Sequence, residues 1–424
     1  MNSSRLSSEV KKLTVFRQLL EDSVMQAMLN FLDSGSSNKE SAYGELYYKL
    51  TLAAEKNFLF VKNGWQNHLL NLILYHDNPF TRQAAFGRHI SPSLYRAAEH
   101  DLQILHHLFQ LDIASPVPWD EMFTENNKSE QIFSFTKKII QSLVAAKSWE
   151  NCVHSLIDYY SAAGAGIFGR YHTLRWDGER CSIVGVNSPD PVKLTDLIGY
   201  QRERQTVLDN TEAFLSGKTA NNVLLYGDRG TGKSSTVKAL ANAYGEKGLR
   251  LIEIPKQYLS DFPVIINKLS NRAQYFILFV DDLSFEDFEV EYKTLKAVLE
   301  GGVEARPKNV LIYATSNRRH LIRESFSERQ QDDVHAADTM QEKLSLSDRF
   351  GLVVTFSAPG QKQYLEIVEG LAKQRGLRIK KEELHRRALQ WALNHSGRSG
   401  RTARQFIDYL TGSEFHRLNQ HQQL

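Results

Sequence analysis

The sequence predicts an α/β core with a parallel sheet, preceded and followed by mostly helical segments. Strand-like apolar runs alternate with amphipathic helices between residues 223 and 356, a pattern typical of parallel strands joined by crossover helices on both faces. Apolar residues recur at helical spacing from about residue 13 to 150 and again from 361 to 424. With 424 residues the chain exceeds one ordinary hydrophobic core, so we expect two or three domains.

Turn and linker residues suggest where these parts meet. The pair Asp177-Gly178 predicts a tight hairpin between two short strands, and the polar, proline-containing run 187–191 is typical of a linker. We therefore expect four segments, which are a helical domain (1–165), a hairpin with its linker (166–193), the α/β core (194–358) and a small helical domain (359–424).

Composition is that of a soluble globular protein. Hydrophobic residues make up 42% and charged residues 24%, and the net charge of +3 does not by itself demand a nucleic-acid partner. The two cysteines, Cys152 and Cys181, have no metal-ligand spacing, which argues against a disulfide framework and a zinc site. Residues 1–13 lack the apolar core of a signal peptide, and no apolar run reaches the length of a membrane span. We expect a cytoplasmic protein with no membrane partner.

A glycine-rich loop carries the clearest chemistry. It runs from Gly227 to Ser234, after the apolar run 223–226 and before a helix-forming stretch. Glycines let the backbone approach phosphate oxygens, and N–H groups at the start of a helix attract anions. Lys233 can reach the β- and γ-phosphates and the Ser234 hydroxyl can bind Mg²⁺, which predicts a nucleoside triphosphate site. Its expected contacts are Gly227, Asp228, Arg229, Gly230, Thr231, Gly232, Lys233, Ser234 and Ser235.

Polar residues follow two later strands. The buried run 276–280 ends in Asp281 and Asp282, and the carboxyl ends of parallel strands are where the nucleotide is expected. Asp281 is a candidate Mg²⁺ ligand and Asp282 a candidate base for the attacking water, with Glu286 as an alternative carboxylate. Asn317, beyond the strand 310–314, can hydrogen-bond the γ-phosphate or that water.

Together these segments resemble the AAA+ ATPase module over about residues 194 to 412. Gly227 to Ser234 resembles its Walker A loop, Phe276 to Asp282 its Walker B strand and Asn317 its sensor 1. Leu197 to Tyr200 resembles the adenine-side segment, which implies that Ile198 and Gly199 contact the nucleotide. The resemblance implies a P-loop NTPase core with a C-terminal helical lid, and ATP with Mg²⁺ as its ligands.

Two arginines acquire roles only through this resemblance. Leu346 to Phe350 resembles the arginine-finger segment, so Arg349 is implied to reach the ATP of a neighbouring subunit in a homo-oligomer. Ser399 to Phe406 resembles the sensor 2 region, where Arg404 fits best and Arg401 is the second choice.

One residue departs from the common pattern. Most AAA+ ATPases have Glu where this chain has Asp282, and the shorter side chain is shared with replication initiators and helicase loaders. The whole arrangement most resembles an uncharacterised bacterial AAA+ family known as domain of unknown function 815. The implied activity is Mg²⁺-dependent hydrolysis of ATP to ADP and phosphate, used to remodel a protein or nucleoprotein partner.

A basic segment near the C-terminal end is compatible with functions other than protein remodelling. Between Lys373 and Arg404 ten lysines and arginines stand against two acidic residues. Such a cluster can follow a nucleic-acid backbone or can be a solvated helical face. The alternatives to a protein-remodelling ATPase are therefore a nucleic-acid-associated ATPase of loader type and a slow nucleotide-dependent binding switch.

Overall fold

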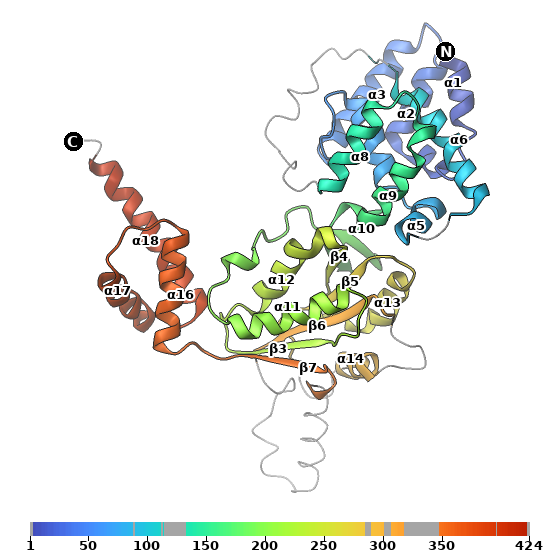
Figure 1. Cartoon of the computed structure of the whole chain (residues 1–424). Helices are drawn as coiled ribbons and strands as arrows, with labels where there is room; N and C mark the ends of the chain where they lie inside the picture. Colours follow the sequence, from blue (N-terminus) through green and yellow to red (C-terminus); the bar gives the residue numbers. More distant parts are fainter. Residues whose placement is uncertain are drawn as a thin grey trace. The chain divides into compact units, whose positions relative to one another are not determined.

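The computed structural model describes residues 3–87, 90–111, 113, 133–284, 290–300, 307–317, 347–395 and 397–421. The chain forms two compact units, both drawn in Figure 1. The first comprises Met1–Tyr171 together with Arg272–Gln274, and the second comprises His172–Asn271 and Tyr275–Leu424.

The first unit is helical around one hydrophobic core. Polar caps fix where its helices begin: the Asp22 carboxylate accepts N–H bonds from Val24 and Met25, and Asn78 forms a capping box with Thr81. Its helices are α1 (Ser3–Val10), η1 (Arg17–Glu21), α2 (Ser23–Asp33), α3 (Lys39–Ala54), α4 (Gly64–Leu74), α5 (Pro79–Ala85), α6 (Pro92–Phe109), α8 (Ser134–Ala145), η3 (Trp149–Cys152), α9 (Val153–Ala163) and α10 (Ile167–Arg170).

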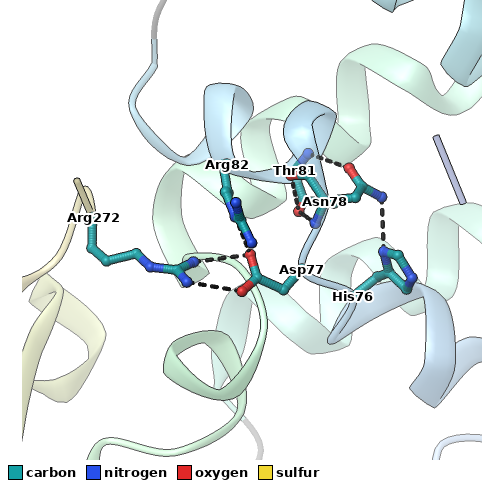
Figure 2. A network of polar contacts seen from close by, with 6 residues as sticks. All are labelled: His76, Asp77, Asn78, Thr81, Arg82 and Arg272. Atoms are coloured by element: carbon teal, nitrogen blue, oxygen red, sulfur yellow. Dashed lines mark hydrogen bonds and ion pairs between the residues drawn. The ribbon is translucent and has the colours of Figure 1, made fainter. Parts of the chain in front are cut away.

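A polar network in this unit includes a residue from far along the chain, as Figure 2 shows. Asp77 accepts one hydrogen bond from Arg82 Nε at 2.7 Å and two from the Arg272 guanidinium at 2.9 Å each. Burial raises the pKa of Asp77, but the hydrogen bonds from Arg272 and Arg82 outweigh it and leave the pKa below its ordinary value. Burial lowers the pKa of the adjacent His76 to about 4, so this ring is neutral at pH 7.

Asp101 is a fully buried carboxylate in the same unit. It accepts hydrogen bonds from the backbone N–H groups of Thr14 and Phe16 at 2.9 Å each, and from the Thr14 hydroxyl at 3.0 Å. These bonds hold the segment after α1 against α6, 85 and 87 residues away along the chain.

Replacing Asp101 with leucine is expected to destabilise the first unit by about 3 kcal/mol, because the N–H groups of Thr14 and Phe16 and the Thr14 hydroxyl lose a charged acceptor. Faster hydrogen exchange in α1 and α6 would measure this loss. Asp101→Asn should cost less, since the amide keeps one acceptor oxygen. As a matched control, Asp33→Asn removes an exposed partner of Lys11 and should have little effect. Equal exchange in the Asp101→Leu and Asp33→Asn variants would contradict the expectation.

The second unit contains a seven-stranded sheet in the order β2-β1-β4-β5-β6-β3-β7. All neighbouring strands are parallel except β1 and β2, which form an antiparallel hairpin. The parallel α/β core predicted from the sequence is therefore confirmed, and the hairpin of β1 and β2 extends its sheet. The strands are β1 (Thr173–Asp177), β2 (Ser182–Gly185), β3 (Val223–Gly227), β4 (Leu249–Glu253), β5 (Tyr275–Val280), β6 (Val310–Ser316) and β7 (Leu352–Phe356).

Helices cover both faces of this sheet. Every residue of β6 is buried, and so are all residues of β5 after its first; because successive side chains point to opposite faces, both faces must be covered. The helices of this unit are η4 (Leu194–Asp196), α11 (Gln201–Leu215), α12 (Lys233–Tyr244), η5 (Gly245–Lys247), η6 (Lys256–Asp261), α13 (Phe262–Ser270), α14 (Val290–Glu300), α16 (Gln361–Gln374), α17 (Lys381–Asn394) and α18 (Gly400–His421).

The last three helices form the C-terminal helical part of the second unit. Their apolar faces meet in a core that continues into α11, α12 and one face of the sheet, with Tyr364, Ala388 and Phe406 among its members. Among the helices that the structure describes, none combines the length and apolar character needed to cross a bilayer.

Candidate nucleotide site

The glycine-rich loop joins β3 to α12. Gly227 ends β3 with a φ of +134°, and a Cβ at this position would lie 2.1 Å from the carbonyl oxygen of Phe356 in β7, so only glycine fits. Gly232, with a φ of +95°, precedes α12. In the described chain, the backbone N–H groups of residues 232–235 donate to no backbone carbonyl. The first turn of α12 therefore offers several free donors to an anion.

Lys233 lies in this loop with 6% of its surface exposed. Its ammonium donates to the carbonyl oxygens of Gly227 at 2.7 Å and Asp228 at 2.8 Å, and to Asn317 Oδ1 at 3.2 Å. Burial lowers the pKa of Lys233, and the nearby carboxylates oppose that shift. The cation is thus held by oxygen atoms at the mouth of the phosphate loop.

The two predicted Mg²⁺ ligands, Ser234 and Asp281, are hydrogen-bonded to each other. Asp281 follows β5, and its Oδ1 accepts a hydrogen bond of 2.6 Å from the Ser234 hydroxyl at the start of α12. Asp282 has a φ of +54°, and its Oδ1 accepts a hydrogen bond of 2.5 Å from Asn317 Nδ2. A hydroxyl and a carboxylate at one point are hard oxygen ligands of the kind Mg²⁺ prefers.

These residues border a cavity of about 760 Å³. Most of the site residues predicted from the sequence line it, namely Ile198, Gly199, Arg229, Gly230, Thr231, Gly232, Lys233, Ser234, Ser235, Asp281, Asp282, Asn317 and Arg404. Gly227 and Asp228 instead support the loop through their carbonyl contacts with Lys233. A cavity of this size, with free N–H donors, a lysine and a hydroxyl–carboxylate pair at one end, fits a nucleoside triphosphate with its metal ion.

Arg349 is not among the residues that line the cavity. Its Nε donates to Glu300 Oε1, at the end of α14, at 2.5 Å. Glu286, the alternative carboxylate, and Leu346, the first residue of the finger-like segment, lie outside the described residues.

The C-terminal helices complete one wall of the cavity. Ile367 of α16 lies against Gly199, and Gly370 lies against Ile198, where a Cβ would be 2.5 Å from Ile198 Cδ1. At the start of α18 the N–H of Arg401 donates to the Gly230 carbonyl at 3.1 Å. Arg401 and Arg404 both line the cavity, so the structure brings together both candidates for the sensor 2 arginine.

Further polar residues, Thr315 and Arg204 among them, line the cavity without having been assigned a role from the sequence. Thr315, near the end of β6, donates to Asp281 Oδ1 at 2.5 Å. The sequence signal that could have identified this residue is its position two residues before Asn317. Arg204, in α11, donates to the Leu197 carbonyl oxygen. No pattern in the sequence separates Arg204 from the other charged residues of that helix.

One family model matches most of the second unit. A family model described as "Protein of unknown function (DUF815)" matches residues 169–414. Solved structures of RuvB from Thermotoga maritima are similar to part of the chain. The one described as a Holliday junction branch migration motor is 18% identical, with a TM-score of 0.35, over 51% of this chain and 63% of that chain. Two RuvB mutants are 18% identical, with TM-scores of 0.37, over 53% of this chain and 67% and 68% of theirs. No curated protein matches.

Proposed function

We propose a function for this chain, which belongs to the DUF815 family of proteins of unknown function and whose motifs resemble the AAA+ module. It binds ATP with Mg²⁺ and hydrolyses it to remodel a protein or nucleoprotein partner. One observation supports this above all. Lys233, Ser234, Asp281, Asp282 and Asn317, from three separate segments, meet through hydrogen bonds at the carboxyl edge of one parallel sheet.

In this proposal the phosphate chain lies on the free N–H groups at the start of α12. Lys233 then exchanges its bonds to carbonyl oxygens for bonds to the β- and γ-phosphates, which carry more charge. Ser234 and Asp281 hold Mg²⁺, which when bound neutralises charge on the phosphate oxygens. Ile198 and Gly199 contact the adenine side, and Arg404 or Arg401 joins the nucleotide to the C-terminal helices.

Hydrolysis requires a water molecule placed in line with the γ-phosphate. Asn317 bridges the two relevant groups, because its amide nitrogen donates to Asp282 and its amide oxygen accepts from Lys233. One carboxylate oxygen of Asp282 is thereby fixed, and the other is available to orient the water and accept its proton. Arg349 is proposed to act on the ATP of a neighbouring subunit, where its charge stabilises the transferring phosphoryl group.

Ion pairs within the basic C-terminal segment weaken the case for a loader that binds nucleic acid. Arg375 pairs with Asp408, Lys381 with Glu369, and Arg386 with Glu383. Each of these cations is already partly neutralised, which reduces the charge that could follow a phosphate backbone. Arg401 and Arg404 line the nucleotide cavity. A protein-remodelling ATPase is therefore a better supported hypothesis than a loader that binds nucleic acid.

The Asp282→Asn variant tests the proposal. We expect it to bind ATP as tightly as the unchanged protein in calorimetry, because the phosphate loop is intact. Phosphate release should fall by about 100-fold or more, since a general base is lost. Asp209→Asn, on the surface of α11, is the matched control and should hydrolyse ATP normally. If the unchanged protein showed no Mg²⁺-supported affinity for ATP, the proposed function would be wrong.

A further inference from the structure

The hydroxyl of Thr315 lies at the centre of the acidic end of the site. This residue is 2% exposed and sits in β6, the strand beside β5 in the sheet. Its Oγ1 donates a hydrogen bond to Asp281 Oδ1 at 2.5 Å and accepts one from the backbone N–H of Asp282 at 2.9 Å. One hydroxyl therefore uses its donor and an acceptor on two consecutive residues of the neighbouring segment.

These bonds stabilise a backbone conformation at Asp282 that is unfavourable for a residue with a side chain. Asp282 has a φ of +54°, in the left-handed region that side-chain-bearing residues seldom adopt. Its N–H is held by Thr315 Oγ1, and the N–H of Leu283 donates to the Thr315 carbonyl at 2.7 Å. Thr315 thus holds the backbone N–H groups of Asp282 and of the residue after it, and these bonds fix the direction in which the chain leaves β5.

The same hydroxyl helps to determine which carboxylate oxygen of Asp281 is available to a metal ion. Oδ1 receives the hydroxyl of Ser234 at 2.6 Å, the hydroxyl of Thr315 and the N–H of Asp282 at 3.1 Å. Among the described residues, Oδ2 of Asp281 has no hydrogen-bond partner. The carboxylate is thereby held in one orientation, with a single oxygen available to a metal ion.

We propose that Thr315 is a positioning residue for the magnesium site: its hydroxyl orients Asp281 toward the ion and holds Asp282 in its left-handed conformation. This inference rests on the proposed function. It assigns to Thr315 a role that acts through the two aspartates.

The test compares Thr315→Val, which has nearly the same shape but no hydroxyl, with Thr315→Ser, which keeps the hydroxyl. Binding of a non-hydrolysable ATP analogue is measured by calorimetry with and without Mg²⁺. In Thr315→Val the gain in affinity that Mg²⁺ provides should fall by about tenfold, the lower end of what outer-shell partners of a metal contribute. Affinity without Mg²⁺ should be unchanged, because Lys233 and the loop are intact.

Two comparisons make the result specific. Thr315→Ser should restore the Mg²⁺-dependent gain. Thr211→Val, which removes an equally buried hydroxyl bonded to Tyr313 on the same strand, should bind both with and without Mg²⁺ like the unchanged protein. An unchanged Mg²⁺ gain in Thr315→Val, or an equal loss in Thr211→Val, overturns the proposal. Absence of any Mg²⁺ gain in the unchanged protein would instead count against the proposed function.

Discussion

Replacing Lys233 with alanine is expected to lower the affinity for ATP by at least about 100-fold, because a largely buried cation can no longer meet the phosphates. The variant also loses the three bonds that Lys233 makes to Gly227, Asp228 and Asn317. Nucleotide titration by calorimetry measures the affinity, and a thermal melt shows whether the second unit remains folded.

The control for this prediction lies on the same helix. Lys238 is five residues further along α12 and does not line the cavity, so Lys238→Ala should bind ATP normally. If Lys233→Ala and Lys238→Ala bound ATP equally well, the phosphate loop would not be the nucleotide site.

Replacing Arg349 with alanine is expected to lower the turnover of ATP by about 1,000-fold or more while leaving its affinity unchanged, which is the usual effect of removing an arginine finger. Arg349 does not line the cavity of its own chain and pairs there with Glu300, so its loss should not disturb binding. In the unchanged protein, turnover per subunit should rise with protein concentration as neighbouring subunits meet.

Mixing two inactive variants tests whether Arg349 acts across an interface. Arg349→Ala subunits keep an intact site, and Asp282→Asn subunits keep an intact arginine. A mixture should therefore recover part of the activity that each lacks alone. Full activity of Arg349→Ala would argue for a slow switch that makes no use of a finger, and a loss that mixing does not restore would place Arg349 in its own site.

Much of the second unit could be predicted because its signals are local. The apolar runs that became β3, β5, β6 and β7 are each bounded by polar or glycine residues, so their positions follow from a few neighbouring side chains. The loop from Gly227 to Ser234 is likewise one continuous segment, and its glycine at 227 has a steric reason that the structure supplies. Fold class could thus be read from the sequence and is confirmed.

Long-range contacts explain what could not be predicted. Nothing near Thr173 indicates that β1 pairs in parallel with β4, more than seventy residues later. Similarly, Arg272 lies between α13 and β5, yet its carboxylate partner is Asp77, and the distance along the chain is 195 residues. The role inferred for Thr315 depends on two hydrogen bonds to the segment that follows β5. Such pairings depend on tertiary packing, which a local pattern of residue types does not encode.

The dependence of the phosphate loop on β7 has a consequence for synthesis. The N–H of Asp228 donates to the Phe356 carbonyl at 3.0 Å, and its carboxylate accepts the N–H of Ala358, 130 residues away along the chain. A growing chain that has left the ribosome only as far as β6 has every residue of the loop but lacks the strand against which it is shaped. If the chain binds nucleotide as proposed, we expect the nucleotide to stabilise this loop only after β7 has emerged, because two of the hydrogen bonds that hold Asp228 come from the end of that strand.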